Sequence, residues 1–144
     1  MKLSTILLVE DNPNDVELIT GSLKEFNLAN TIDVAEDGVE ALDYLRYKGK
    51  FSHRSTGYPA VILLDIKMPR MDGIEVLQAI RKDTELKLIP VVMLTSSQED
   101  KDLIRSYSLG VNAYVVKPVD FDQFTEAVKT IGMFWAILNE LPPS

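Results

Sequence analysis

Four short apolar runs, each followed at once by a polar or charged residue, constrain the fold of this chain most strongly. The runs span residues 6–9, 61–64, 91–94 and 114–116. The residues that follow them are Glu10 with Asp11, Asp65, Thr95 and Lys117. Short and fully apolar runs are typical of buried parallel strands, and open α/β sheets bind ligands beyond the carboxyl ends of their strands. We therefore expect three carboxylates, a hydroxyl and an ammonium to converge at one edge of a sheet.

The stretches between these runs have the spacing of amphipathic helices. Asn12 can cap a helix with Pro13 at its first position, and Asp72 with Glu75 three residues later matches a capping box. Residues 31–35 alternate polar and apolar side chains, which predicts a less buried strand at a sheet edge. Side chains expected to face the core from the helices are Val16, Ile19, Leu23, Phe26, Ala41, Leu42, Leu45, Ile74, Leu77 and Ile80.

Two more helices are expected in the last third of the chain. Ser97 can cap one that ends at Gly110, a residue suited to a left-handed C-terminal conformation. The other begins at Asp120, with Gln123 in the reciprocal capping position. Five strands then alternate with five helices, which indicates an α/β fold with a doubly wound parallel sheet. We expect the flavodoxin-like strand order 2-1-3-4-5.

Composition narrows the class of protein. A chain of 144 residues is long enough for one domain with a single core. Its net charge of −7 argues against nucleic-acid binding, which requires a basic face. Cysteine is absent, and no apolar stretch is long enough for a signal peptide or a membrane span. We therefore expect a cytoplasmic protein that binds neither nucleic acid nor membrane.

The acidic residues at the strand ends predict a metal site. In the expected strand order the first and third strands are neighbours, so Asp65 would lie beside Glu10 and Asp11. Like charges about 4 Å apart repel by roughly 4 kcal/mol at an effective dielectric of 20, and a hard dication such as Mg²⁺ relieves this repulsion. Lys117 and Thr95 would then receive an anion with several oxygens, which favours phosphate. Asp65 is the best candidate nucleophile toward phosphorus, because it stands alone at its strand end.

Several of these side chains also have plainer interpretations. A carboxylate after a strand can simply cap the next helix, and for Asp72 we prefer that interpretation. Thr95 could be an ordinary β-branched strand residue, and Tyr114 could be a packing residue. His53, the only histidine, lies in the long connection 48–59, and we assign it no function.

Four segments of the chain resemble the receiver domain of two-component response regulators. They read VEDN at 9–12, LDIKMPRMDG at 64–73, LTS at 94–96 and YVVKP at 114–118. The resemblance covers about residues 4–132. It implies that Asp65 accepts a phosphoryl group from a phosphohistidine on a sensor histidine kinase, and that the protein is a signalling phosphoacceptor and not an enzyme.

The same resemblance implies how a metal would be held. Mg²⁺ would be bound by Asp11, Asp65 and the main-chain carbonyl of Lys67, with Glu10 acting largely through water. The one mild departure is Glu10, where many members of the family have Asp. Its longer reach should alter the metal geometry without abolishing binding.

Three further features follow from the resemblance. Thr95 and Tyr114 match the family's switch pair, which is expected to alter the surface of the fourth helix, fifth strand and fifth helix and so change partner binding. Lys117 matches the family's lysine, and the bond between Lys117 and Pro118 matches a site where the family carries a cis peptide bond.

A finer resemblance concerns the long loop and the end of the chain. The loop 48–59 and the extended last helix look like those of single-domain regulators paired with bacterial phytochromes. We expect one receiver domain over residues 1–144, with an extended helix and tail at about 133–144. With no output domain expected, the signal would leave through the surface of the receiver itself.

The last helix predicts a homodimer. Its expected core stripe is formed by Phe124, Val128, Ile131 and Trp135. Met133 and Ile137 lie off that stripe, so the outer face is also apolar and needs a covering surface. The family commonly pairs through its fourth and fifth helices. The alternative is that the end of the chain folds back over its own core.

Two other functions compete with the phosphoacceptor. A Mg²⁺-dependent aspartyl-phosphate phosphatase of the haloacid dehalogenase type also uses an Asp at a strand end, but that family needs a second Asp at the position of Lys67. A phosphate-independent interaction scaffold would not require Asp65, Thr95 and Lys117 together. The sequence leaves open which kinase, stimulus and downstream partner belong to this chain, and how long an acyl phosphate would last.

Overall fold

The computed structural model describes residues 3–25, 29–54, 57–96, 110–111, 113–117, 122–123 and 126–127. Strands and helices alternate along the described residues as far as β4, as predicted. The elements are β1 (Leu3–Val9), α1 (Pro13–Glu25), β2 (Ala29–Ala35), α2 (Gly38–Leu45), the 3₁₀ turn η1 (Gly49–Phe51), β3 (Val61–Asp65), α3 (Gly73–Lys82), β4 (Val91–Thr95) and β5 (Ala113–Val116). Residues 122–123 and 126–127 are also helical. In this part of the chain no helix has both the length and the apolar character needed to cross a membrane.

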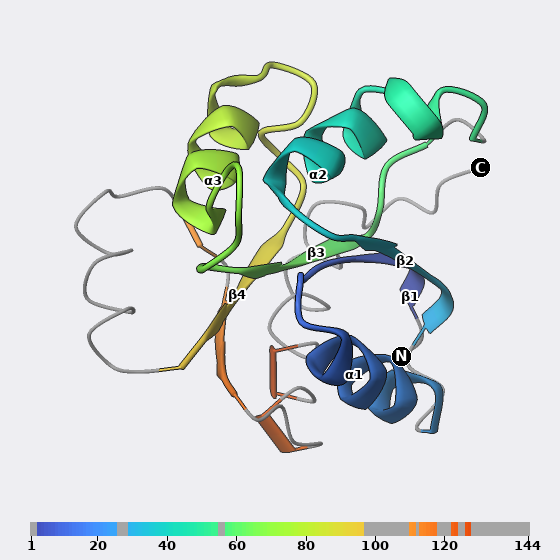
Figure 1. Ribbon diagram of the computed structural model, residues 1–144, viewed down its shortest axis with the longest axis vertical. Helices are drawn as coiled ribbons and strands as arrows, with labels where there is room; N and C mark the ends of the chain where they lie inside the picture. The colour runs from blue at the N-terminus through green and yellow to red at the C-terminus, as the bar shows by residue number, and fades with distance from the viewer. Residues whose placement is uncertain are drawn as a thin grey trace, which may run out of the picture.

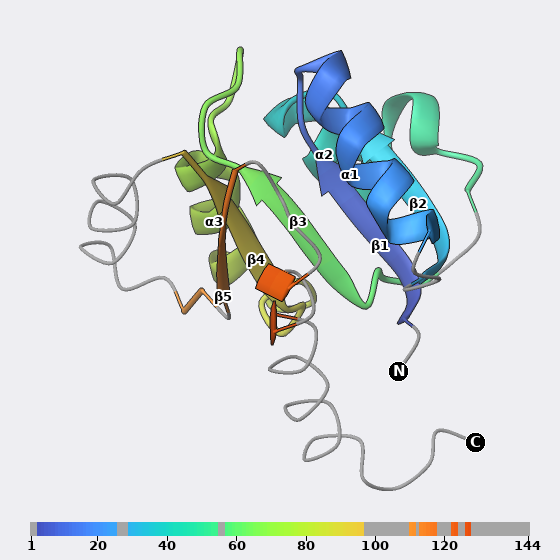
Figure 2. The same cartoon turned by 90° about the horizontal axis from the view of Figure 1, so that it is seen from below.

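The five strands form one parallel sheet in the order β2-β1-β3-β4-β5 (Figure 2). This is the predicted flavodoxin-like order, and it places β2 at an edge as its alternating pattern indicated. Helix α1 covers one face of the sheet, and α2 with α3 covers the other (Figure 1). Val9 pairs with Leu64, and Thr95 pairs with Val116. The carboxyl ends of these strands therefore lie along one edge of the sheet.

The core has two layers because alternate residues of each central strand point to opposite faces. Every residue of β3 and β4 is buried, which explains why their sequences are apolar throughout and end in Asp65 and Thr95. The strand residues packed with α2 and α3 are Leu7, Val9, Ile62, Leu64, Val91 and Met93. Those packed on the face of α1 are Ile6, Leu8, Val61, Leu63, Val92, Leu94 and Val115. Ala127 joins the layer on the α1 face.

The starts of α1 and α3 have the predicted caps. The Asn12 side chain accepts a hydrogen bond from the Asn14 N–H at 2.8 Å, and α1 begins at Pro13. Asp72 and Glu75 form the reciprocal capping box of α3. Gly110 has a φ of +67°, in agreement with the left-handed conformation expected there.

Some predictions fall on parts of the chain that the structure does not describe. The helices expected to begin at Ser97 and at Asp120, and the apolar outer face of the last helix, lie outside the described residues. Gln123 is described, and its side chain accepts a hydrogen bond from the Val116 N–H at 2.9 Å.

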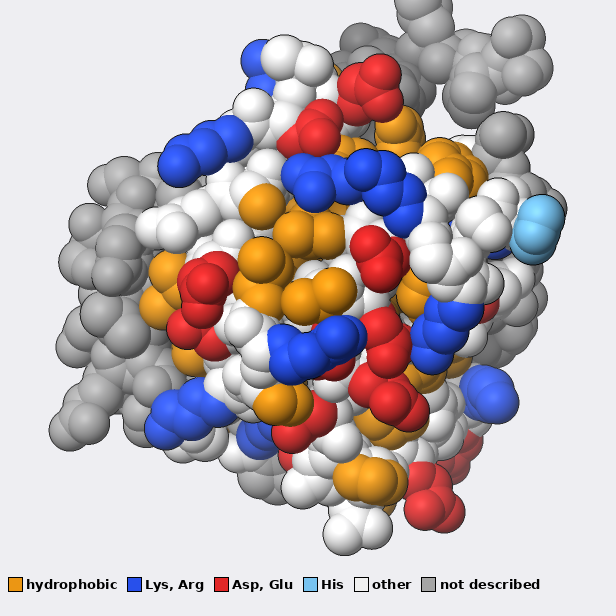
Figure 3. Space-filling view, turned by 45° about the horizontal axis from the view of Figure 1, so that its top comes forward, with side chains coloured by type: hydrophobic (Ala, Val, Ile, Leu, Met, Phe, Trp, Pro, Cys, Tyr) orange, Lys and Arg blue, Asp and Glu red, His pale blue; other side chains and the backbone are white. Residues whose placement is uncertain are grey.

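In the described part of the long connection after α2, Arg54 packs against two tyrosines. The Arg54 guanidinium stacks 3.9 Å from the ring centre of Tyr44 and 4.0 Å from that of Tyr47. Arg54 Nε also donates to the main-chain oxygen of Tyr44 at 2.7 Å. His53 is exposed, as expected, and is the pale blue side chain at the edge of the surface in Figure 3. The same view shows acidic and basic side chains interspersed on this face.

Candidate functional site

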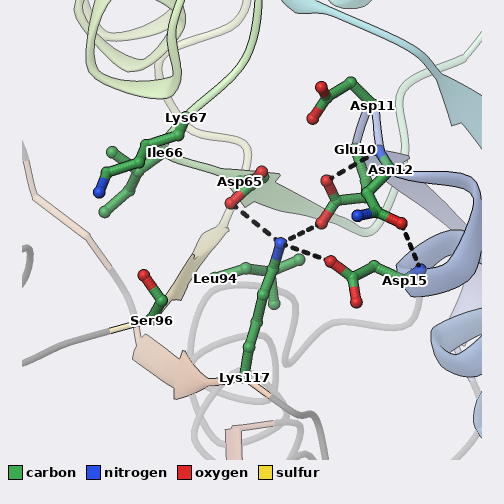
Figure 4. A pocket seen from close by; sticks show the side chains of 10 residues that line it. All are labelled: Glu10, Asp11, Asn12, Asp15, Asp65, Ile66, Lys67, Leu94, Ser96 and Lys117. Atoms are coloured by element: carbon green, nitrogen blue, oxygen red, sulfur yellow. Dashed lines mark hydrogen bonds and ion pairs between the residues drawn. The ribbon is translucent and has the colours of Figure 1, made fainter.

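The carboxyl ends of the strands bring most of the sequence-predicted residues to one pocket (Figure 4). The pairing of β1 with β3 carries Glu10 to the side of Asp65, and the pairing of β4 with β5 carries Lys117 to the same edge. The pocket has a volume of about 240 Å³. It is lined by Glu10, Asp11, Asn12, Asp15, Asp65, Ile66, Lys67, Leu94, Ser96 and Lys117.

Three carboxylates form a candidate metal site. Glu10, Asp11 and Asp65 each offer one ligand oxygen, and these oxygens lie within 4.8 Å of one another. Glu10 is fully buried and Asp65 is buried, whereas Asp11 is exposed at the mouth of the pocket. An all-oxygen donor set fits a hard dication such as Mg²⁺ or Mn²⁺, and His53 is not among the pocket residues.

Lys117 compensates the negative charge of this cluster. Its Nζ lies 3.3 Å from Asp65 Oδ1 and 3.1 Å from Asp15 Oδ2, and it also forms an ion pair with Glu10 Oε1. Burial by itself would lower the pKa of Lys117, but the hydrogen bond to Glu10 and the charge of Asp65 outweigh it and raise the pKa above its ordinary value. The lysine is therefore a fixed positive charge within reach of the Asp65 carboxylate.

Glu10 is the carboxyl group most affected by burial. Removal from water is the largest contribution that raises its pKa from 4.5 to about 7, and the neighbouring charge of Asp65 adds to the increase. The hydrogen bond from Lys117 acts in the opposite direction. Glu10 therefore keeps its proton more readily than an exposed carboxyl group, which limits the negative charge that gathers around Lys117.

Thr95 and Tyr114 lie close to this pocket in the sheet but do not line it. Thr95 is 1% exposed, and its Oγ1 has no hydrogen-bond partner among the residues that the structure describes. A buried hydroxyl without a partner is costly, which makes Thr95 Oγ1 available to an incoming oxygen. Tyr114 is partly buried and packs against the core layer of α2 and α3.

The geometry agrees with a comparison against known protein families. Residues 6–129 match the model of the response regulator receiver domain. The chain belongs to the response regulator receiver family. The predicted resemblance is thus confirmed.

Relatives with known names or structures extend this result. The receiver domain is 40% identical to the probable methanogenesis regulatory protein FilR2 of Methanothrix harundinacea, over 95% of this chain and 86% of the relative. The structure of the bacteriophytochrome response regulator AtBRR is 57% identical, with a TM-score of 0.87 over 96% of this chain and 99% of that one. The Mn²⁺-bound form of the response regulator Rcp1 is 34% identical, with a TM-score of 0.71 over 97% of each chain. The likeness to regulators associated with phytochromes was also predicted, and it is confirmed.

The loop between β3 and α3 of this receiver domain is held in place by a glycine at its end. Gly73 donates its N–H to the Ile66 carbonyl at 2.8 Å. A Cβ at this position would lie 2.2 Å from the main-chain oxygen of Asp65. Only a residue without a side chain allows this approach, so Gly73 fixes the course of the segment that carries Asp65 and Lys67.

The same loop is tied to α2 by an ion pair that sequence reasoning did not identify. Arg70 Nε donates to Asp37 Oδ2 at 2.8 Å, and Arg70 Nη2 donates to Asp37 Oδ1 at 3.0 Å. Hydrogen bonding from Arg70 lowers the pKa of Asp37, which also caps α2 by accepting the Glu40 N–H at 2.9 Å. Arg70 has a φ of +65°, a strained conformation for a residue with a side chain.

Asp15 is the pocket residue that the sequence analysis missed. It lies in the first turn of α1, where an acidic side chain is ordinarily explained by the helix dipole. Figure 4 shows its carboxylate directed at the Lys117 ammonium. Its position three residues after Asn12 is one that any acidic residue of a first helical turn can occupy, so the sequence held no signal that set it apart.

Proposed function

We propose that this receiver domain is a phosphoacceptor in which Asp65 is the residue that becomes phosphorylated. The observation that carries this proposal is the position of the Asp65 carboxylate, 3.3 Å from Lys117 Nζ and grouped with Glu10 and Asp11. A carboxylate beside a fixed ammonium and a cation site can attack phosphorus while charge on the phosphoryl oxygens is neutralised.

The proposed donor is a phosphohistidine on a sensor histidine kinase. An Asp65 carboxylate oxygen forms a bond to phosphorus as the phosphorus–nitrogen bond of the donor breaks, and the electron pair of that bond stays on the imidazole nitrogen. The product is an acyl phosphate on Asp65 and a free histidine. The similarity to bacteriophytochrome response regulators supports a phytochrome-type kinase as the partner. The domain would act once per transfer and would not turn over a substrate.

The proposed metal ligands are Asp11, Asp65 and the main-chain carbonyl of Lys67, with Glu10 acting through water. Bound Mg²⁺ would supply positive charge that stabilises the oxygens of the transferring group. The related regulator Rcp1 has a Mn²⁺-bound form, which supports a divalent cation here. The proposed role of Lys117, whose Nζ lies 3.3 Å from Asp65 Oδ1, is to stabilise the negative charge of the phosphoryl oxygens.

Thr95 and Tyr114 are the proposed switch residues. Thr95 Oγ1, which has no partner among the described residues, would donate to a phosphoryl oxygen and gain the hydrogen bond that it lacks. This contact exists only in the phosphorylated state, so it can shift the population of two conformations near Tyr114. The output is a changed affinity for a partner at the surface next to β5.

The function is tested by incubating the protein with Mg²⁺ and acetyl phosphate, then resolving phosphorylated chains on a gel that retards them. We expect a retarded band for the wild type that disappears when the metal is removed with a chelator. The Asp65→Asn variant should give no such band. A band of equal intensity in Asp65→Asn would refute the assignment, and steady release of phosphate from esters would favour a phosphatase.

A homodimer through the last helix stays a prediction. Its apolar residues Met133 and Ile137 lie outside the described part of the chain. Sedimentation of the double variant Met133→Glu with Ile137→Glu tests it: loss of the dimer mass supports pairing through this helix, and a mass equal to that of the wild type contradicts it.

A further inference from the structure

Lys117 is bound by a third carboxylate that does not belong to the metal cluster. Asp15 Oδ2 lies 3.1 Å from Lys117 Nζ, but Asp15 is not part of the group of metal-ligating carboxylates formed by Glu10, Asp11 and Asp65. We propose that Asp15 is a positioning residue that holds the Lys117 ammonium over Asp65 during phosphoryl transfer. This inference rests on the proposed function of Asp65 and deepens it.

The start of α1 explains why the Asp15 carboxylate can reach the pocket. Asp15 occupies the third position of the helix, from which an acidic side chain often turns back to the N–H of the capping residue. Here the Asn12 N–H donates to Glu10 Oε2 at 3.3 Å instead. The Asn12 side chain in turn accepts the Asp15 N–H at 3.2 Å. The Asp15 backbone is thereby fixed while its carboxylate points to Lys117 (Figure 4).

The two other partners of Lys117 have to change during the proposed reaction. Asp65 forms a bond to phosphorus, and Glu10 faces the cation site, so neither can hold the ammonium in one place throughout. Asp15 does not form the bond to phosphorus and is not one of the three carboxylates grouped at the cation site, so its contact with Lys117 can persist before and after transfer. A lysine has a long flexible side chain, and a permanent counter-ion reduces the number of conformations in which its ammonium is misplaced.

Burial makes the contact between Asp15 and Lys117 more than a surface ion pair. The exposed fraction of the side chain is 19% for Lys117 and 32% for Asp15. Water screens such a pair less than one that is fully solvated. The geometry therefore favours a measurable effect on the position of the ammonium.

The test compares the rate of phosphorylation by acetyl phosphate at saturating Mg²⁺ in Asp15→Asn and in the wild type. We expect transfer to be roughly tenfold slower in Asp15→Asn, because the ammonium is held less firmly. The matched control is Glu17→Gln, which removes one negative charge from an exposed position on the same helix. Glu17→Gln should keep the wild-type rate.

A double-variant cycle separates positioning through Lys117 from a general effect of charge. In the Lys117→Ala background, Asp15→Asn should cause no further loss of rate. An equal loss in both backgrounds would overturn the inference, as would an Asp15→Asn rate equal to or above that of the wild type. If the wild type itself is not labelled on Asp65, it is the proposed function that fails.

A second measurement does not depend on phosphorylation. NMR of the lysine side-chain signals reports the order of the Lys117 ammonium in the resting protein. Asp15→Asn should make this signal more mobile and Glu17→Gln should leave it unchanged. A Lys117 signal that is equally ordered in Asp15→Asn would overturn the positioning role.

Discussion

Lys117 Nζ lies 3.3 Å from Asp65 Oδ1, across the ends of β3, β4 and β5. The two residues are far apart in the sequence. They meet because β3, β4 and β5 are parallel and β4 pairs with both of the others, so the carboxyl ends of all three strands lie at the same edge of the sheet. In the proposed transfer to Asp65, the ammonium would stabilise the negative charge of the phosphoryl group, which is greatest in the transition state.

Replacing Lys117 should separate metal binding from phosphoryl transfer. We expect Lys117→Ala to retain Mg²⁺ affinity, because the carboxylate ligands remain, but to accept phosphate from acetyl phosphate about a hundredfold more slowly. Calorimetric titration with Mg²⁺ and single-turnover labelling measure the two effects. The control is Lys82→Ala, which removes an exposed lysine of α3. A transfer rate in Lys117→Ala equal to that of Lys82→Ala would contradict the role of the ammonium.

The buried Glu10 makes the stability of the metal-free protein depend on pH. Its pKa is raised from 4.5 to about 7 by burial, so the folded state binds this proton more tightly than the unfolded state. The resulting stabilisation is complete below pH 4.5 and is lost as the pH rises through about 7. We expect the free energy of unfolding in the presence of a chelator to fall by an amount on the order of 1–3 kcal/mol across this window.

Urea unfolding of Glu10→Gln at the same pH values isolates this effect. The variant has no titrating group at position 10, so its stability should decline less over the same window. If the free energy of unfolding falls with pH by the same amount in Glu10→Gln and in the wild type, another group is responsible for the pH dependence.

Gly73 should be the least replaceable glycine near the site. A methyl group there would lie 2.2 Å from the Asp65 carbonyl oxygen and 2.8 Å from the Ile66 Cα, so the backbone has to move. We expect Gly73→Ala to lower the free energy of unfolding by about 1–3 kcal/mol and to weaken Mg²⁺ binding. The matched control is Gly21→Ala in α1, where, apart from the adjacent residues and the helix's own backbone, the described part of the chain has no atom within 4 Å of the added Cβ. That change should stabilise the protein by about 0.5–1 kcal/mol. An equal change in the free energy of unfolding in Gly73→Ala and Gly21→Ala would contradict the importance of the close approach at Gly73.

The sequence was sufficient for the features that depend on local pattern and on strand order. Fully apolar runs predicted β3 and β4, and the polar residue after each run predicted a site at the carboxyl edge, because a buried strand can carry polar groups only where it ends. Asn12 and the pair of Asp72 with Glu75 predicted two helix starts, because capping involves residues close together in sequence.

The features that escaped prediction depend on contacts between distant segments. Asp15 is indistinguishable in sequence from an ordinary acidic residue in a first helical turn, and only the reach of Lys117 gives it a role. The ion pair between Arg70 and Asp37 joins two segments that are far apart in the sequence. Patterns of neighbouring residues do not predict a contact of this kind. The stacking of Arg54 on two tyrosines likewise depends on how the chain turns after α2.

The central claim is that phosphate is attached to Asp65 and to no other carboxylate of the cluster. Borohydride reduces an acyl phosphate to an alcohol, so treatment of the phosphorylated protein should convert the modified aspartate into homoserine. Peptide mass spectrometry after acetyl phosphate and Mg²⁺ should then find homoserine at position 65. Homoserine at position 11, the reduced form of glutamate at position 10, or no reduced residue at all would contradict the account.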